Sequence, residues 1–521
     1  ISSTIFTSTS IAFLFLGFGG KAILFSPSQL KNSVQNTDDL NFFQKIFDSS
    51  QENKYGYASL IRSLSSLKKF LPKLELNFST GIVLGKIGSK FIRSDRPYSC
   101  LVLAPPGTGK TAGIVIPNLL LCEHSMVVHD PKGELYSITH KVRRDKLKNK
   151  ILLFDPVADD SLKFNIFAKD MLPDDTNDLR AYVANAANII FAGQQIKNNS
   201  SSADGYFESA AKSTFTFFAQ WLIYKNGQTS IPQIRSKLLE DEDTTKTIEA
   251  MVEDDSTPLE IQEDGRGVLT ASVSENQWAG IIGQLKEALE LFADSRIKNV
   301  TDSTCDFTGH TLRKERTTVY LNVQDKDKQR LRPIMSLMLD SISTQLVSRM
   351  PDEDSNQITF VLDEFVRLGK MDFISDLPSI SRGYKLNFIF VAQDYEQISN
   401  TYGQSYISIF ETNCAYKIVF RQNNYTTAER ISKLIGNRTT TRISTSRNQS
   451  NKGDLKISLQ NSSGKSKSTS SEGISLITPQ DILNLHSDNC LLLVQGHAGK
   501  PILARSPMWF QEKELTKLIQ R

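Results

Sequence analysis

Short apolar runs recur along the chain from about residue 80, and each ends in a turn or a carboxylate. They lack the alternation of apolar and polar residues, which is typical of strands buried on both faces of a mostly parallel sheet. Segments with helical spacing lie between them, so the pattern predicts an α/β fold. The predicted strands are SCLVLA (99–104), SMVVHD (125–130), ILLFD (151–155), TTVYLNV (317–323), ITFVLDE (358–364), NFIFVAQ (387–393), YKIVF (416–420) and CLLLVQ (490–495).

Residues 171–314 interrupt this rhythm, because they contain no convincing strand. Apolar residues recur there at helical spacing, as in YFESAAKSTFTFFAQWLIYK (206–225) and QWAGIIGQLKEALELFA (277–293). We therefore predict an inserted all-α domain over 171–314, which divides the α/β domain into residues 80–170 and 315–521.

The first 20 residues, ISSTIFTSTSIAFLFLGFGG, carry no charge, and Lys21 follows them. Their apolar part is slightly shorter than the roughly 20 residues of a membrane span. Neither a basic segment before it nor a small-residue cleavage site after it supports a signal peptide, and a buried globular helix is the other alternative. We predict a membrane segment over 1–25, cut short at its start, with the basic residues after it on the cytoplasmic side. Residues 26–79 are predicted to be a linker of unassigned role.

Composition and charge narrow the function classes only a little. The net charge of +4 on 521 residues is weak support for nucleic-acid binding. The five cysteines form no CxxC pair and the six histidines show no ligand spacing, so neither a disulfide framework nor a zinc site is indicated. The Ser/Thr/Asn-rich stretch 437–473 has seven Lys or Arg against two Asp or Glu, a local charge of +5. We predict a flexible loop there, suited to DNA phosphates, to anionic lipid or to solvent alone.

A turn rich in proline and glycine follows the first predicted strand and precedes a helix. APPGTGKT, from Ala104 to Thr111, fits the phosphate-loop pattern GxxxxGK[ST] except that Ala104 takes the first position. In such a loop, glycines let backbone N–H groups converge on phosphate, the lysine reaches the β- and γ-phosphates, and the threonine hydroxyl binds Mg²⁺. A chance strand–turn–helix is the alternative. The predicted nucleotide-binding residues of this loop are Pro106, Gly107, Thr108, Gly109, Lys110 and Thr111.

Paired carboxylates end a second apolar strand, ITFVLDEF (358–365). Asp363 is predicted to orient the waters around Mg²⁺, and Glu364 to polarise the attacking water. Two acids on a solvated strand end are the alternative, but ligands bind at the carboxyl ends of parallel strands. The next strand ends in Gln393, which is predicted to sense the γ-phosphate or to position water.

In the order of its motifs, the chain resembles the coupling proteins of type IV secretion and conjugation, the TraG/VirD-type ATPases of the FtsK/HerA group. The resemblance covers about residues 80 to 505, with Ile166 at a usual proline, and Ser381 and Asp394 at a usual alanine and serine. The motifs that carry it are LAPPGTGKTAGIVIPNLL, VVHDPKGELY (127–136), FDPV…KFNIF (154–167), LDEF, SISRGYKLNFIFVAQDYEQI (379–398) and ITPQDILNL (477–485).

The resemblance implies a membrane-anchored homo-hexamer with a RecA-like P-loop domain, at the bacterial inner membrane and with most of the chain cytoplasmic. It implies ATP and Mg²⁺ as cofactors. Its partners would be the channel components and a cargo of single-stranded DNA with a relaxase, of effector proteins, or of both. Lys110, Thr111, Asp363, Glu364 and Gln393 take the roles given above.

Three further positions carry implied or open roles. Arg382 matches an arginine proposed to reach a neighbouring subunit's ATP, and a structural ion pair is its alternative. Asp130 and Lys132 are assigned either a direct role or a turn that supports the phosphate loop. For the whole chain, the alternatives to a coupling ATPase are a substrate-docking platform with little ATPase activity and a soluble FtsK/HerA-like DNA pump.

Overall fold

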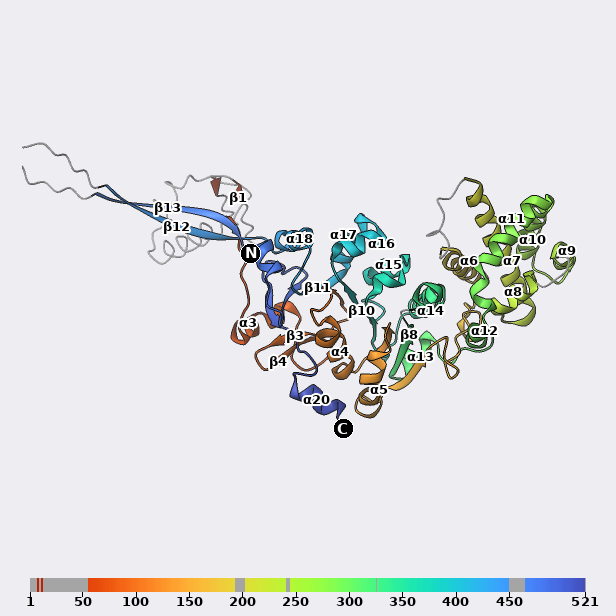
Figure 1. The fold of residues 1–521 in the computed structure, drawn as a ribbon, viewed down its shortest axis with the longest axis horizontal. Helices are drawn as coiled ribbons and strands as arrows, with labels where there is room; N and C mark the ends of the chain where they lie inside the picture. The colour runs from red at the N-terminus through yellow and green to blue at the C-terminus, as the bar shows by residue number, and fades with distance from the viewer. Residues whose placement is uncertain are drawn as a thin grey trace, which may run out of the picture. The chain divides into compact units, whose positions relative to one another are not determined.

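A computed structural model describes most of the chain. The described residues are 7–8, 11–12, 55–192, 202–239, 244–324, 326–448 and 464–520. They divide into two compact units, Ile1–Ser59 with Ser432–Ile477 and Leu60–Ile431 with Thr478–Arg521. The large unit contains a β-sheet and the helices that cover it (Figure 1).

Eleven strands form this sheet, in the order β4-β3-β15-β14-β11-β5-β10-β9-β6-β8-β7. All strands from β11 to β7 run parallel, and β14, β15, β3 and β4 continue the sheet as antiparallel neighbours. The prediction of a mostly parallel sheet is confirmed. The strands are β3 (Ile82–Ile87), β4 (Lys90–Ser94), β5 (Ser99–Leu103), β6 (Ser125–Asp130), β7 (Lys150–Phe154), β8 (Thr317–Asn322), β9 (Ile358–Leu362), β10 (Leu386–Ala392), β11 (Cys414–Val419), β14 (Asn489–Val494) and β15 (Ile502–Arg505).

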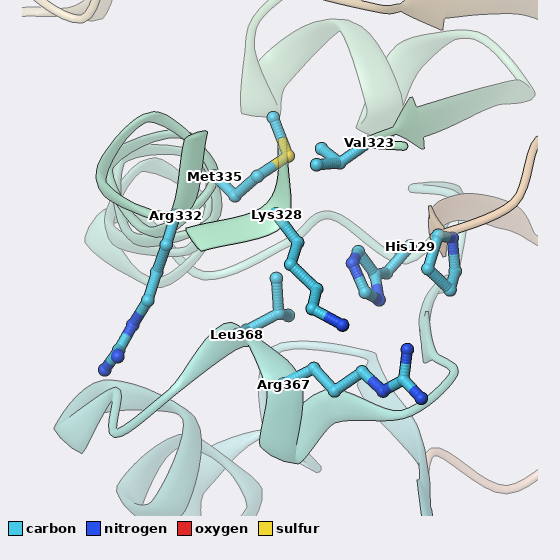
Figure 2. A pocket seen from close by; sticks show the side chains of 8 residues that line it. His129, Val323, Lys328, Arg332, Met335, Arg367 and Leu368 are labelled. Carbon is cyan, nitrogen blue, oxygen red and sulfur yellow. The ribbon is translucent and has the colours of Figure 1, made fainter. Parts of the chain in front are cut away.

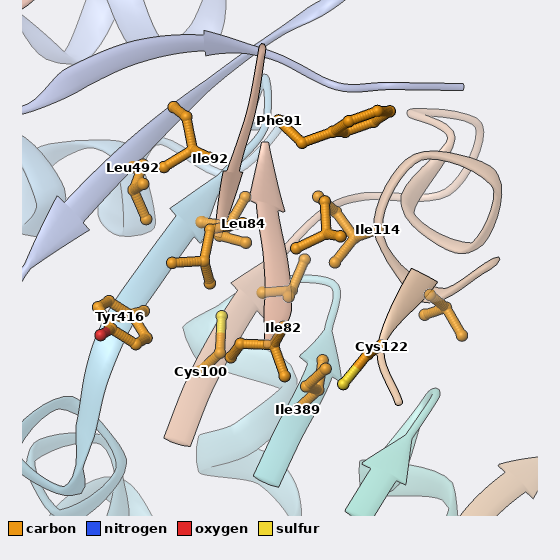
Figure 3. Packing of buried hydrophobic residues seen from close by; sticks show 14 of the residues in the cluster. Ile82, Leu84, Phe91, Ile92, Cys100, Ile114, Cys122, Ile389, Tyr416 and Leu492 are labelled. Carbon is orange, nitrogen blue, oxygen red and sulfur yellow. The ribbon is translucent and has the colours of Figure 1, made fainter. Parts of the chain in front are cut away.

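Helices cover both faces of the sheet. The face shown in Figure 3 packs aliphatic side chains such as Leu84, Ile114 and Ile389 into one buried cluster. On the other face, aromatic rings stack, with the Phe360 and Phe388 centroids 4.8 Å apart. The helices of this α/β part are α3 (Leu64–Leu74), α4 (Ile116–Leu121), α5 (Glu134–Asp145), α14 (Lys328–Ser348), α15 (Asp372–Ile380), α16 (Tyr395–Tyr402), α17 (Gln404–Asn413), α18 (Tyr425–Ile435), α19 (Pro479–Leu483) and α20 (Lys513–Ile519), with the short turns η1 (Thr111–Val115) and η4 (Phe365–Leu368).

Between β7 and β8 the described residues form helices and no strand, apart from the isolated bridge Phe164–Cys305. The long helix α7 contacts α6, α8, α10 and α11, so it lies at the centre of this group. The group contains η2 (Lys169–Met171), α6 (Thr176–Ala192), α7 (Ser202–Asn226), α8 (Ile231–Leu239), α9 (Thr244–Glu253), α10 (Leu259–Ser272), α11 (Glu275–Ala288), η3 (Glu290–Ala293), α12 (Ser295–Thr301) and α13 (Gly309–Lys314).

The segment predicted to be a flexible loop, 437–473, differs from that prediction. β12 (Asn437–Asn448) pairs with β13 (Gly464–Ser475) as an antiparallel ribbon in the smaller unit. The sequence of β12 is rich in threonine and includes Ile443, and such β-branched residues favour extended backbone. Composition alone predicted a loop because the sequences of these two strands show no regular alternation of apolar and polar residues.

The predicted linker over 26–79 is also not a linker throughout. Within it, α3 begins after the N-cap Ser63. It buries Leu67 and Leu74 in the hydrophobic cluster on the sheet face that Figure 3 shows. Most of the predicted membrane segment over 1–25 lies outside the described residues, which here are the strand pair β1 (Thr7–Ser8) and β2 (Ile11–Ala12). Among all described residues, no helix has the length and apolarity needed to cross a bilayer.

Candidate active site at the carboxyl edge of the sheet

The phosphate loop leaves the sheet at the carboxyl end of β5. The Ala104 N–H donates to the carbonyl oxygen of Ala392, 2.9 Å away, which ties the loop to the end of β10. Gly107 and Gly109 have φ of 78° and 80°, in the left-handed region that favours glycine. A Cβ atom at Gly107 would meet nothing within 4 Å, so open space faces the loop there.

A helix begins directly after the loop, as the phosphate-loop pattern requires. The π-helical turn η1 starts at Thr111 and continues into α4. Asn118 of α4 anchors this helix on β3, since its Oδ1 accepts from the Val83 N–H at 2.7 Å and its Nδ2 donates to the Val83 carbonyl at 2.8 Å. The loop is therefore held rigidly at both ends.

The acidic pair follows β9, which is separated from β5 only by β10. The Thr111 hydroxyl donates to Asp363 Oδ2 at 2.8 Å, and Lys110 Nζ donates to Glu364 Oε1 at 3.1 Å. The structure thus brings these four predicted residues together, although about 250 positions of sequence separate the two members of each pair. Gln393 directly follows β10, the strand that lies between β5 and β9.

Burial and charge act against each other at Asp363. Its side chain is only 5% exposed. Burial raises the pKa of this carboxyl, while the Lys110 ammonium and the Thr111 hydroxyl lower it and offset part of that effect. The net effect still raises its pKa. Oδ1 of Asp363 has no hydrogen-bond partner among the described residues, which leaves a buried acceptor open beside the loop.

Sequence reasoning missed His129, which lies on β6 beside β9. Its Nδ1 is 2.7 Å from the carbonyl oxygen of Asp363. Burial lowers the pKa of His129, so the ring is neutral and holds its proton on Nδ1, where the carbonyl accepts it. Sequence patterns did not indicate His129, because its partner Asp363 lies far from it in the sequence.

Asp130 ends the same strand and was predicted either to act directly or to support a turn. Its Oδ2 accepts from the Tyr136 N–H at 2.8 Å, at the start of α5, which favours the supporting role. Burial raises the pKa of Asp130. Lys132 is exposed, and its charge is near enough to lower the pKa of Asp363.

Arg382 is not brought to this site by its own chain. It precedes β10, so it lies at the amino end of the strand, whereas the phosphate loop lies at the carboxyl end. Its guanidinium stacks 4.3 Å from the centroid of Tyr98 and donates to Gln495 Oε1 at 2.9 Å. Its action on a neighbouring subunit stays a prediction.

The chemistry of the donor set fits a nucleotide with its magnesium ion. The described residues contain no cluster of three or more His, Cys, Asp or Glu that would hold a metal by protein ligands alone. Thr111 and Asp363 offer instead one hydroxyl and one carboxylate with an open oxygen. Magnesium ions in phosphate-transfer sites are held by few protein oxygens, with water and phosphate as the other ligands.

Comparison with known proteins identifies the family. The model of the family described as type IV secretory system conjugative DNA transfer matches residues 77–520. The chain belongs to this family. The protein VirD4 of Rhizobium radiobacter is 27% identical over 442 residues, which cover 83% of this chain and 60% of VirD4. The conjugal transfer protein TraG of Escherichia coli is 26% identical over 388 residues, covering 69% of this chain and 59% of TraG.

The chain also shares its fold with solved structures. The bacterial conjugative coupling protein TrwB, lacking its first 70 residues and in complex with sulphate, aligns with a TM-score of 0.61 at 16% identity, over 87% of this chain and 94% of TrwB. TrwB in complex with ADP and Mg²⁺ aligns with a TM-score of 0.59 at 15% identity, over 87% and 94% of the two chains. The α/β part therefore has the RecA-type fold of TrwB. The chain spans about 60% of the length of the VirD4 relatives.

Proposed function

We propose that this chain is a coupling ATPase of a type IV secretion system, which uses ATP and Mg²⁺ to move a cargo into the secretion channel. The observation that carries the proposal is the pairing of Lys110 with Glu364 and of Thr111 with Asp363 at the carboxyl edge of a RecA-type sheet. Family membership supports the same conclusion, since the matching family is described by conjugative DNA transfer.

Each residue has a chemical task that follows from its position. Backbone N–H groups between Gly107 and Thr111 bind phosphate oxygens at the helix start, where the helix dipole favours anions. Lys110 turns from Glu364 to the phosphates and neutralises the charge that develops there. Thr111 and Asp363 would hold the magnesium ion, which supplies charge stabilisation to the phosphates.

Glu364 accepts the proton of the attacking water in this scheme, and Gln393 orients that water from the neighbouring strand. The pairing with Lys110 keeps Glu364 engaged while no phosphate is bound. Hydrolysis therefore begins only when Lys110 has another anion to bind, and this couples chemistry to nucleotide binding.

The finer assignments rest on the family resemblance. We propose a homo-hexamer anchored in the bacterial inner membrane, with most of the chain in the cytoplasm. Arg382 of each subunit serves the site of its neighbour, and the domain division 80–170 with 315–521 and 171–314 separates the motor from an all-α cargo-facing part. The cargo is single-stranded DNA with a relaxase, effector protein, or both.

The test is ATP hydrolysis by the purified chain, with and without single- and double-stranded DNA, beside Lys110→Ala. We expect hydrolysis that rises with DNA and falls about 100-fold or more in the variant, because the lysine stabilises transition-state charge. A folded chain that binds nucleotide without hydrolysing it, at concentrations that allow assembly, would favour a docking platform instead.

A further inference from the structure

Glu364 is enclosed between two cationic side chains from different parts of the site. Lys110 Nζ lies 3.1 Å from Oε1, and Arg367 Nε lies 2.6 Å from Oε2. The Glu364 side chain is 12% exposed. A carboxylate with so little water around it needs a cation or hydrogen bonds to offset the cost of burying its charge.

The two cations are attached to the protein in different ways. Lys110 belongs to the phosphate loop and is placed to bind an anion there. Arg367 belongs to η4, the short turn that follows Glu364, and its N–H donates to the carbonyl oxygen of Glu364 at 2.8 Å. The buried side chains of Phe365 and Leu368 fix this turn on the sheet. Arg367 therefore stays with Glu364 whatever the phosphate loop binds.

The backbone of Glu364 supports the same distinction. Its φ of 54° and ψ of 42° lie in the left-handed region, which is unfavourable for a residue other than glycine. This conformation reverses the direction of the chain after Glu364. The side chain of Arg367, three residues later, therefore reaches back to the Glu364 carboxylate. Figure 2 shows Arg367 and Lys328 pointing into a hollow beside His129.

The contact between Arg367 and Glu364 is governed by charge. Oε2 accepts no well-aligned hydrogen bond from the described residues, although Arg367 Nε is 2.6 Å away. Charge neutralisation of this kind matters most when the other cation leaves. Of the two cations, only Arg367 then remains beside the Glu364 carboxylate.

We propose that Arg367 is a positioning residue that holds the Glu364 carboxylate when Lys110 leaves it for phosphate, so that nucleotide binding does not strand a buried anion. The inference rests on the proposed function, because it assigns the exchange of Lys110 to nucleotide binding. The inference adds Arg367, as a fixed partner of Glu364, to the site formed by the phosphate loop and the acidic pair.

A double-mutant cycle on nucleotide affinity tests this role without hydrolysis. The dissociation constant of a fluorescent ADP analogue with Mg²⁺ is measured for the wild type, Arg367→Met, Glu364→Gln and the double variant. We expect Arg367→Met to weaken binding about five- to tenfold in the wild type and not at all in the Glu364→Gln background, since a neutral amide needs no cation. Arg367→Lys, which keeps the charge, should retain most of the affinity.

Arg330→Met is the matched control, because Arg330 forms an ion pair with Asp327 at the same three-residue spacing, on α14. It should leave the dissociation constant unchanged. An equal loss of affinity from Arg367→Met in both backgrounds would overturn the inference and leave a structural role. No loss in either background would overturn it as well.

Hydrolysis separates this inference from the function on which it rests. A wild type that binds the analogue but hydrolyses no ATP would refute the ATPase, while the cycle would still decide the role of Arg367. A wild type that hydrolyses ATP but shows no coupling in the cycle would refute only the role of Arg367. An Arg367→Met variant that hydrolyses faster than the wild type would also overturn the positioning role.

Discussion

Two aspartates are buried equally in this chain, yet their surroundings differ. Asp363 ends a strand at the carboxyl edge of the sheet, and Asp340 lies in the middle of α14, where α6 packs against it. Each is 5% exposed, and burial raises the pKa of both. Asp363 has the Lys110 charge and the Thr111 hydroxyl nearby, whereas Asp340 accepts one hydrogen bond, from Asn185 Nδ2 at 2.7 Å.

The difference shows what makes a buried carboxylate useful. At Asp363 an ammonium and a hydroxyl favour the anion, and one carboxylate oxygen is left open toward the phosphate loop. At Asp340 a single amide leaves the pKa at about 7, so the group is partly protonated at neutral pH. Burial alone therefore does not mark a functional carboxylate, whereas burial beside a cation on a neighbouring loop makes a carboxylate a candidate for the site.

The largest expected effect separates the two aspartates by activity. Asp363→Asn should lower ATP hydrolysis about 100-fold or more, because it removes the charge that we propose holds the magnesium ion while keeping the shape of the side chain. Asp340→Asn should leave the rate within about twofold, since it lies outside the site. Steady-state hydrolysis at pH 7.5 measures both. A comparable loss in the two variants would contradict the comparison and point to coupling between α14 and the site.

Sequence patterns predicted the part of this site that lies on strand ends and in the phosphate loop. Lys110, Thr111, Asp363 and Glu364 follow apolar strands, and the order of parallel strands brings such ends together. His129 and Arg367 were missed because their partners are set by the pairing of β6 with β9 and by the left-handed turn at Glu364. Neither feature leaves a spacing pattern in the sequence.

The same limit applies to the fold. The strands β3, β4 and β15 were not predicted, since each includes lysine, arginine or glycine. They add antiparallel neighbours to a sheet whose parallel core was evident from continuous apolar runs. Asp340 was also missed. A single acid within the apolar helix α14 is expected to face solvent, and only the structure shows that α6 covers it.

A smaller effect sharpens the comparison through stability. The pKa of Asp340 is about 7 in the folded chain and about 3.9 in an unfolded one. Between these values the folded state binds the extra proton, so the contribution of Asp340 to unfolding free energy falls as pH rises from about 4 to 7. Asp340→Asn removes this titration and should be more stable than the wild type by roughly 2–4 kcal/mol at pH 8, with little difference at pH 4.5.

Chemical unfolding of the wild type and Asp340→Asn at both pH values measures that effect. The comparison uses the difference between the two proteins, because other groups titrate in both. Asp363→Asn serves as the contrast, since there the substitution also removes a favourable charge interaction with Lys110. An Asp340→Asn variant that gains no stability at pH 8 would show that water or a local rearrangement already solvates the anion.

The smallest expected effect concerns the one amide that Asp340 has. Asn185→Ala removes the donor to Asp340 Oδ2, and a hydrogen bond to a charged group contributes about 1.5–3 kcal/mol. The carboxyl can respond by keeping its proton, so the measured loss at pH 8 should be nearer 1 kcal/mol, and its pKa should rise further. In the Asp340→Asn background the partner is a neutral amide oxygen, and the cost should fall to about 0.5 kcal/mol. An undiminished cost in that background would mean that Asn185 stabilises the packing of α6 on α14 rather than the charge. The contrast with Asp363 would then rest on the Lys110 charge and the Thr111 hydroxyl alone.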